Sequence, residues 1–330
     1  MQKSAEVFSI KAIDYARSEP CVIRETAHWA VVYKPPRLPT APLRAEERNT
    51  LVYWFLHNDE TGGIGLSGNT QINAPSDDMQ RDVSELPADY GQRIQEVRSG
   101  NKREIETASI RVREAQVHGK KAIEAGLLHR LDTDTRGLVL FAKEQAVYDF
   151  LAARQEAGRI IKTYCAFVEP NLSPIRADNG YGFDITDLSA IKGLSAAQEK
   201  IAAQLPRSLE SQFRNFGPGA KRVAPVFPGS RHYKKDGRLY TTVVEAVDIL
   251  PSLPLLRVRC RLSRGYRHQV RAHLAAAGLP IVGDPLYAPQ EAQDAHRSLQ
   301  LYAVSLEFPD PENPRQNICV VLPPPDKMNP

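Results

Sequence analysis

Two short segments of this 330-residue chain carry most of the side chains that could do chemistry. The first is HRLDTDTRG at residues 129–137, which places an imidazole, two carboxylates and two guanidinium groups directly before an apolar run. Asp and Thr side chains also cap their own backbone in turns that have no function, so composition alone favours a structural turn. A hydrolase built on Asp132 and His129 would need a partnered base and nucleophile, which this spacing does not supply.

The second segment contains GYRHQVRAHL at residues 265–274. Residues 269–277 are predicted to form a short helix whose two large apolar side chains face inward. His268 and His273 are five residues apart, which is poor spacing for a shared metal on a helix. The four cysteines lie far apart and lack the spacing of zinc ligands. We therefore expect a reduced protein without a metal.

Basic charge is concentrated in two segments, although the net charge is only +4. Residues 257–273 contain six arginines and no acid, and residues 214–238 contain seven Lys or Arg and one acid. Strand side chains alternate between faces, so Arg257, Arg259 and Arg261 are expected to line one face of a strand. Such surfaces fit a polyanion, although charge alone does not distinguish RNA from DNA or from an anionic protein. Aromatic side chains that could stack on bases lie close by in the sequence: Phe213, Phe216, Phe227, Tyr233, Tyr240 and Tyr266.

The elements that must position these segments alternate irregularly between strands and helices. Short turns and long connections between them do not produce the regular rhythm of a doubly wound fold. We therefore expect an α+β fold with a mixed, mainly antiparallel central sheet and flanking helices. Strands are predicted over residues 21–24, 29–33, 138–142, 160–168, 240–249 and 256–262, and helices over residues 51–56, 144–157 and 269–277.

Two long connections have a polar composition. Residues 58–122 contain few large apolar side chains and are predicted to be a surface insertion, and residues 170–220 a second peripheral excursion. With 42 % hydrophobic and 25 % charged residues, the chain as a whole is neither disordered nor fibrous. No apolar run reaches the roughly 20 residues that span a bilayer, and the N-terminus lacks a signal-peptide core. We expect a cytoplasmic protein without a membrane partner.

Taken together, these segments resemble the RluA-type family of RNA pseudouridine synthases. The resemblance lies in GLLHRLDTDTRGLVLFAK at residues 126–143, IIKTYCAFVEP at residues 160–170 and GYRHQVRAHLAAAGLPIVGDPLYA at residues 265–288. Residues 32–36 resemble the family's opening turn, and residues 297–303 its closing strand. The matches keep the family's order, and together they make a strong joint signal for one catalytic domain.

The resemblance implies an active cleft across the middle of the sheet, with neither a metal nor an organic cofactor. The reaction that it implies converts a uridine of structured RNA, in rRNA or tRNA, to pseudouridine. The N1–C1′ bond breaks, the flipped-out uracil rotates, and C5 bonds to C1′. By its place in HRLD, Asp132 is implied to be the catalytic carboxylate. Whether Asp132 adds covalently to the nucleoside or removes a sugar proton stays open.

The resemblance also implies partners for this carboxylate. Arg271 corresponds to the basic residue that would pair with the acid and keep it ionised. Tyr164 matches the family's active-site tyrosine, whose ring could stack on the flipped uracil and whose hydroxyl could help the proton leave C5. Arg130 is expected to support the flipped nucleotide or its phosphate. Further RNA contacts are expected from Arg136, Arg257, Arg259, Arg261, Arg267 and His268.

Two departures from the family pattern flank the expected cleft. Arg136 stands where the family usually has Ser, and Tyr266-Arg267 stand where it usually has Arg-Thr. They indicate either an altered RNA context, with Arg136 as an added phosphate contact, or a catalytically silent RNA-binding protein. We favour the first because all three expected catalytic residues are present. About 20 residues precede the first predicted strand, so we expect a single domain over residues 1–330, without an S4-like N-terminal RNA-binding domain, and a monomer.

Overall fold

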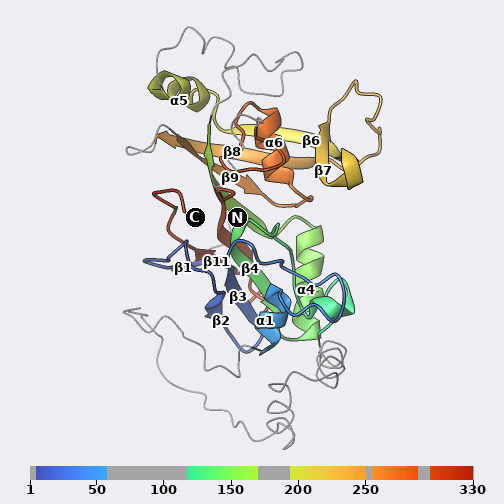
Figure 1. Cartoon of the computed structure of the whole chain (residues 1–330). Coiled ribbons are helices and arrows are strands. Elements are labelled where there is room, and N and C mark those ends of the chain that lie inside the picture. The colour runs from blue at the N-terminus through green and yellow to red at the C-terminus, as the bar shows by residue number, and fades with distance from the viewer. Residues whose placement is uncertain (1–4, 58–116, 170–193, 250–254, 289–297, 330) are drawn as a thin grey trace, which may run out of the picture.

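The computed structural model describes residues 5–57, 117–169, 194–249, 255–288 and 298–329. Eleven strands within these ranges form one twisted sheet that runs through the molecule (Figure 1). The strands are β1 (Ala5–Ser9), β2 (Cys21–Glu25), β3 (Trp29–Lys34), β4 (Arg136–Ala142), β5 (Ile161–Val168), β6 (Arg207–Phe216), β7 (Arg222–Val226), β8 (Tyr240–Ile249), β9 (Leu256–Leu262), β10 (Leu301–Pro309) and β11 (Asn317–Val321). The helices are α1 (Leu51–His57), α4 (Gln145–Glu156), α5 (Leu194–Ala202) and α6 (Gln269–Ala276), with 3₁₀ turns η3 (Ala122–Glu124) and η5 (Pro218–Ala220).

The order of strands across the sheet is β2-β3-β4-β10-β5-β9-β8-β6-β7. Along this path every neighbouring pair is antiparallel except β4 and β10, which are parallel. Outside the path, β11 pairs antiparallel with β10 and parallel with β1. The predicted mixed, mainly antiparallel sheet is confirmed.

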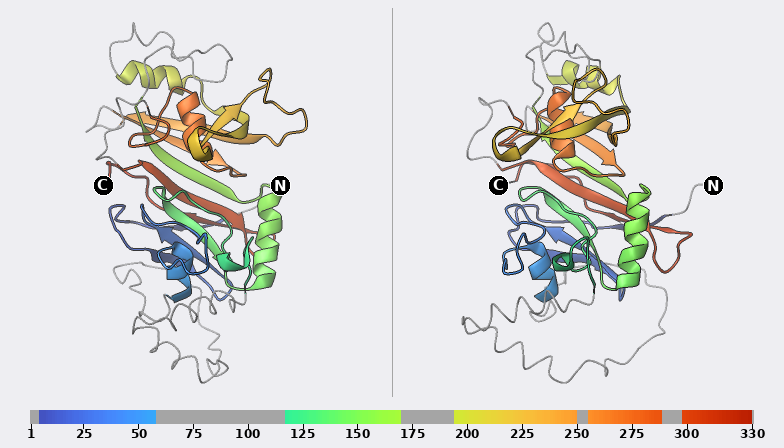
Figure 2. Two further views of the ribbon diagram at one scale, coloured as in Figure 1. Left: turned by 45° about the vertical axis from the view of Figure 1, so that its right-hand side comes forward. Right: turned by 90° about the vertical axis from the view of Figure 1, so that its right-hand side faces the viewer.

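Both faces of the sheet are buried at β4, because successive apolar side chains of this strand point to opposite faces. In β4, Val139 and Phe141 join a cluster with residues of α1 and α6, whereas Leu138 and Leu140 join a second cluster with residues of α4. The right-hand view of Figure 2 shows α1 and α4 on opposite sides of the sheet. We call these the α1/α6 face and the α4 face.

A glycine marks the place where the two halves of the sheet meet. Gly137 on β4 pairs with Ala303 on β10 and has a φ of 126°, a conformation that favours glycine. A Cβ atom at position 137 would lie 2.2 Å from the Ala303 carbonyl oxygen. The Gly of HRLDTDTRG is therefore required by the close approach of β10, which brings β4 and β5 to either side of that strand.

Most predicted elements are confirmed, with ends shifted by one or two residues. The strand expected at residues 297–303 begins further along the chain, at Leu301, and is β10. The prediction that all of residues 170–220 is peripheral is wrong, because β6 pairs with β8 in the main sheet. The predicted insertion at residues 58–122 lies largely outside the described residues, and β1, β7 and β11 were not expected from the sequence.

Candidate active site

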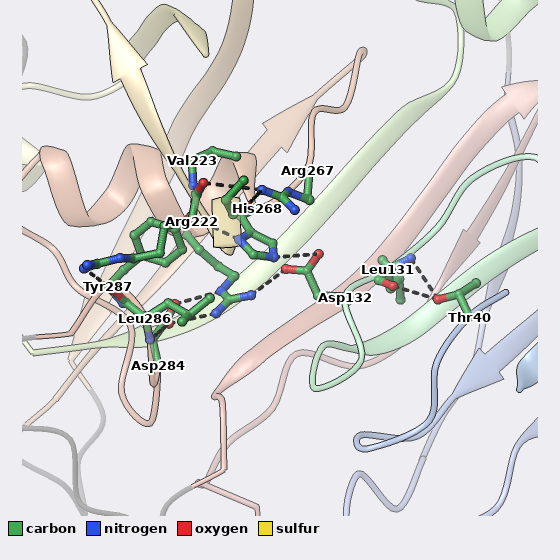
Figure 3. A network of polar contacts seen from close by, with 12 residues as sticks. Thr40, Leu131, Asp132, Arg222, Val223, Arg267, His268, Asp284, Leu286 and Tyr287 are labelled. Atoms are coloured by element: carbon green, nitrogen blue, oxygen red, sulfur yellow. Dashed lines mark hydrogen bonds and ion pairs between the residues drawn. The ribbon is translucent and has the colours of Figure 1, made fainter. Parts of the chain in front are cut away.

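Asp132 lies in the loop that leads into β4, and two side chains hold this loop: Lys34 at the end of β3 and Thr40 in the turn that follows, the latter shown in Figure 3. Thr40 Oγ1 donates to the Leu131 carbonyl at 2.7 Å and accepts the Leu131 N–H at 3.1 Å. Lys34, the last residue of β3, donates to the Thr133 carbonyl at 2.8 Å. Because Leu131 and Thr133 flank Asp132, both chain neighbours of the carboxylate are fixed to this turn.

Lys34 is fully buried although its amine can carry a charge. Its Nζ also donates to the carbonyls of Pro35 at 2.8 Å and Leu38 at 2.7 Å, so three acceptors surround three N–H bonds. Burial lowers the pKa of Lys34 to about 7, against the opposing effect of two nearby aspartates. The loop of Asp132 is thus tied to the core by a buried, fully hydrogen-bonded amine.

The Arg271 side chain extends from α6 to the carboxylate of Asp132. Its Nη1 donates to Asp132 Oδ2 at 2.8 Å, and this pair joins two segments 139 residues apart in the sequence. The Arg271 side chain is only 5 % exposed, whereas Asp132 is 23 % exposed. The cation therefore lies beneath the acid, and the carboxylate opens toward solvent with Oδ1 not bound by the guanidinium.

A second acid, Asp284, anchors the same guanidinium. Arg271 Nε donates to Asp284 Oδ2 and Nη2 donates to Oδ1, both at 2.8 Å, so the contact is bidentate. Asp284 is fully buried and also accepts the backbone N–H groups of Leu286 at 2.9 Å and Tyr287 at 3.1 Å. Burial alone would lower the pKa of Arg271, but the hydrogen bonds and charges of the two aspartates raise it. Arg271 is therefore a permanent cation in a fixed orientation.

Tyr164 lies on β5, on the α1/α6 face, in the same apolar cluster as Leu131. Burial, and next the charge of Asp132, raise the pKa of the Tyr164 phenol. The structure thus pairs Asp132 from a loop with Arg271 from a helix, and places Tyr164 of β5 in the apolar cluster that includes Leu131, the residue before Asp132. The sheet topology explains this, since β5 lies between β10 and β9 in the centre of the sheet.

Three further expected RNA contacts border this site. His268, at the N-cap of α6, places Nε2 3.9 Å from Asp132 Oδ1. Arg130 is 61 % exposed, and its Nη1 lies 4.0 Å from a Glu124 carboxylate oxygen. Arg267 is exposed and donates to the carbonyl of Arg222 at 3.3 Å, so it joins the start of α6 to the β6–β7 hairpin.

The expected phosphate contact at Arg136 is wrong. Arg136 is fully buried, because it follows the alternation of Leu138 and Leu140 and points to the α4 face, away from Asp132. Its guanidinium donates to the Tyr15 carbonyl and to Ser298 Oγ, each at 2.8 Å. The residue that departs from the family pattern is therefore a structural cation beneath the sheet.

The arginine row of β9 does not belong to the site either. Arg257, Arg259 and Arg261 share the α4 side of the sheet, because Leu256, Val258, Cys260 and Leu262 fill the α1/α6 face. Acids accompany all three: Arg257 lies 3.2 Å from Asp248, whereas Glu245 lies 3.6 Å from Arg259 and 2.8 Å from Arg261. The alternation was predicted correctly, but the adjacent strand β8 supplies negative charge that partly compensates the row.

Sequence reasoning missed the residues that support the site. Lys34 and Asp284 lie inside segments that carry the resemblance but were given no role, and Thr40 and Tyr287 were not singled out. An Asp between Gly283 and Pro285 offered a local signal, since carboxylates hold turns. Long-range partners such as Arg271 cannot be read from spacing alone.

The described ranges contain no group of three or more His, Cys, Asp or Glu side chains that could hold a metal ion. Among the helices that the structure describes, none has the length and apolar character needed to cross a membrane.

Comparisons with known proteins agree with this geometry. A family model described as RNA pseudouridylate synthase matches residues 28–276. An RNA pseudouridine synthase of Chloroflexus aurantiacus is 30 % identical over 203 residues, which cover 61 % of this chain and 51 % of that protein. The dual-specificity RNA pseudouridine synthase RluA of Vibrio parahaemolyticus is 27 % identical over 194 residues, covering 57 % and 61 %.

The solved structure of human RNA pseudouridylate synthase domain containing 1 superposes with a TM-score of 0.50 at 15 % identity, covering 96 % of this chain and 87 % of that one. This structural similarity shows that the chain shares the fold of that protein. Against the curated relatives named above, the chain spans between about half and three fifths of their length. The family model covers most of the chain, including the Asp132 loop, Tyr164 and Arg271. This chain belongs to the RNA pseudouridylate synthase family and, within it, to the RluA type.

Proposed function

We propose that this chain is an RNA pseudouridine synthase that isomerises a specific uridine of structured RNA, in rRNA or tRNA, with Asp132 as the catalytic carboxylate. The observation that carries the proposal is the ion pair between Asp132 Oδ2 and Arg271 Nη1 at 2.8 Å, with Asp132 Oδ1 left open. Family membership supports the reaction class. The curated relatives include enzymes named for the ribosomal large subunit and one named as dual-specificity.

The reaction needs an acid that stays ionised and faces the sugar. The N1–C1′ bond of uridine breaks, the uracil turns, and C5 bonds to C1′ in its place. A proton leaves C5 for water and N1 gains one, so that product and substrate are isomers. Arg271 stabilises the Asp132 carboxylate through Oδ2, and Oδ1 is free to attack C1′ or to take a sugar proton.

Tyr164 contributes a surface for the base. Because the pKa of its phenol is raised, the hydroxyl keeps its hydrogen at neutral pH and does not serve as a strong base. The ring can stack on the detached uracil while the base rotates. We assign the removal of the C5 proton to water or to another basic group, and the guidance of the rotating ring to Tyr164.

The target uridine must leave its helix to reach Oδ1, because the Asp132 side chain is mostly buried and pairs with the still more deeply buried Arg271. Extruding a base costs a few kcal/mol, which contacts to the surrounding backbone must offset. Arg130 is exposed beside the loop of Asp132, where it can contact the phosphate of the flipped nucleotide.

Tritium release tests the proposal. Cellular RNA carrying tritium at C5 of uridine is incubated with the wild-type protein, and we expect tritium in the water. Asp132→Asn should abolish the release, whereas Asp134→Asn, a matched change two residues away in the same loop, should retain most of it. If no cellular RNA pool yields tritium with the wild type, the chain is instead a catalytically silent RNA-binding protein.

A further inference from the structure

His268 occupies a position at the site that the expected catalytic residues leave unexplained. It is the N-cap of α6 with a φ of 56°, in the left-handed region that few residues other than glycine adopt. Its Nε2 lies 3.9 Å from Asp132 Oδ1, the oxygen that Arg271 does not bind. Figure 3 shows the ring beside this carboxylate.

A hydrogen-bond chain favours one position for the hydrogen on the His268 ring. The Val223 N–H donates to Tyr287 Oη at 2.8 Å, so this phenol oxygen already accepts one bond. The single hydroxyl hydrogen of Tyr287 can then donate to His268 Nδ1, 3.0 Å away. With Nδ1 as the acceptor, the hydrogen of the neutral imidazole lies on Nε2 and faces Asp132.

The surroundings favour the neutral imidazole. Burial lowers the pKa of His268, and the charges of Arg271 and Arg267 lower it further, whereas the charges of Asp132 and Asp284 raise it. The distance of 3.9 Å to Asp132 Oδ1 exceeds hydrogen-bond length. Among the described residues, no hydrogen bond to another side chain or to the backbone uses Nε2. An oriented N–H donor therefore stands beside the reacting oxygen, ready for a substrate atom.

We propose that the Nε2–H group of His268 donates a hydrogen bond to the ribose 2′-oxygen of the target uridine and thereby selects ribose over deoxyribose. This assignment rests on the proposed function, because it takes Asp132 Oδ1 as the atom that reaches the C1′–C2′ edge of the sugar. The 2′-oxygen is bonded to C2′ and so lies beside that edge. The uracil rotates during the reaction whereas the ribose stays in place, so a rigidly held donor suits the sugar.

The first measurement is the tautomer, which requires no activity. In protein labelled with ¹⁵N-histidine, the His268 signals are identified by their loss in His268→Phe. We expect Nε2 to carry the hydrogen and Nδ1 to be an acceptor. Tyr287→Phe, which keeps the ring and removes only the hydroxyl, should abolish this preference. Hydrogen on Nδ1, or on both nitrogens at pH 7, would overturn the proposal.

The second measurement is binding of uridine 5′-monophosphate and 2′-deoxyuridine 5′-monophosphate. The wild type should bind the ribonucleotide about 3- to 10-fold more tightly, as expected for one neutral hydrogen bond. His268→Phe keeps an aromatic ring without a donor and should lose this preference, whereas His268→Gln keeps an N–H donor and should retain part of it. The exposed His118→Phe is the matched control. An equal preference in wild type and His268→Phe contradicts the proposal.

The two proposals fail separately. If tritium release depends on Asp132 but the ribose preference does not depend on His268, the reaction stands and this role for His268 is wrong. If the ribose preference depends on His268 but no cellular RNA releases tritium, the site recognises a ribonucleoside and the proposed isomerisation is wrong. Thermal unfolding of His268→Phe, His268→Gln and Tyr287→Phe establishes that each variant is folded before these comparisons are made.

Discussion

At the scale of single residues, the site depends on which carboxylates neutralise the charge of the buried Arg271. Arg271 has one carboxylate that is fully buried, Asp284, and one that is open, Asp132. Arginine suits this position because its planar guanidinium binds Asp284 through two donors and still directs a third at Asp132. Lysine would offer a point charge without this geometry, so the two acids and the arginine form one unit.

Asp284→Asn tests that unit. The amide keeps the size of the side chain but removes the buried negative charge, so we expect the free energy of unfolding to fall by about 3 kcal/mol. Arg271 also loses its fixed orientation, and tritium release should fall by about tenfold or more, which corresponds to roughly 1.4 kcal/mol of lost transition-state stabilisation. Chemical denaturation and the tritium assay measure the two effects.

Asp248→Asn is the matched control for this change. Asp248 pairs with Arg257 at 3.2 Å but is half exposed, so its loss should cost less than about 1 kcal/mol and leave tritium release unchanged. Equal effects of the two substitutions would show that Asp284 has no special role in orienting Arg271.

At the scale of elements, α6 is held against the sheet by polar side chains on its buried side. His273 lies between Ser211 Oγ of β6 and Thr242 Oγ1 of β8, each at 2.9 Å from a ring nitrogen. Gln269 donates to the Thr241 carbonyl at 3.0 Å. The helix that carries Arg271 therefore depends on hydrogen bonds to two strands as well as on apolar contact.

This arrangement predicts a loss of stability in acid. Burial lowers the pKa of His273 to about 3, so between pH 6.5 and pH 3 the unfolded chain binds a proton that the folded protein excludes. As the pH is lowered through this window, the free energy of unfolding should decrease, by up to about 1.4 kcal/mol per pH unit from this group. Denaturation of wild type and His273→Gln from pH 7 to pH 4 isolates the contribution, and parallel curves would contradict it.

The strand β6 shows why the sequence predicted only part of the fold. It reads RSLESQFRNF, and its buried positions include Ser211 and Gln212, which form hydrogen bonds in place of apolar contacts. Apolar alternation is the signal for a strand, and it is weak here because polar side chains fill the interior. β9 alternates apolar and charged residues, β4 and β5 contain apolar runs, and all three strands were predicted.

The β6–β7 hairpin carries the exposed part of the second cationic segment. Phe216 is 43 % exposed, and the guanidinium carbons of Arg214 and Arg222 each lie 5.2 Å from its ring centroid. Phe216 and Arg222 are cross-strand partners, and Arg214 is two residues away, so the three share one face. An exposed aromatic ring beside two cations suits an unpaired RNA base with its phosphates.

Substitutions on this face should separate charge from stacking. Arg214→Gln should reduce the salt dependence of RNA binding by about one phosphate contact. Phe216→Ala should weaken binding by about 1–3 kcal/mol without changing the salt dependence. Filter binding of total RNA over a series of salt concentrations measures both, with the exposed Arg159→Gln as a control. If both variants bind as the wild type does, the hairpin is not an RNA contact.

At the scale of the whole molecule, the two halves of the sheet meet at β4 and β10. The catalytic acid precedes β4, and its cation comes from α6 in the other half, so the site forms only when the halves are correctly joined. The resemblance predicted this meeting of distant segments. It did not predict what holds the junction, because Arg136, as a departure from the family pattern, was expected to contact an RNA phosphate.

Arg136→Met tests the junction. The guanidinium that bonds Tyr15 and Ser298 and lies 5.2 Å from the Tyr302 ring joins the N-terminal segment, β4 and β10. Methionine fills the space without these hydrogen bonds, so the free energy of unfolding should fall by about 3 kcal/mol. The salt dependence of RNA binding should stay unchanged, because a fully buried side chain reaches no phosphate. Arg159→Met, an exposed control, should change stability by less than about 0.5 kcal/mol. A lower salt dependence at unchanged stability would instead restore Arg136 as an RNA contact.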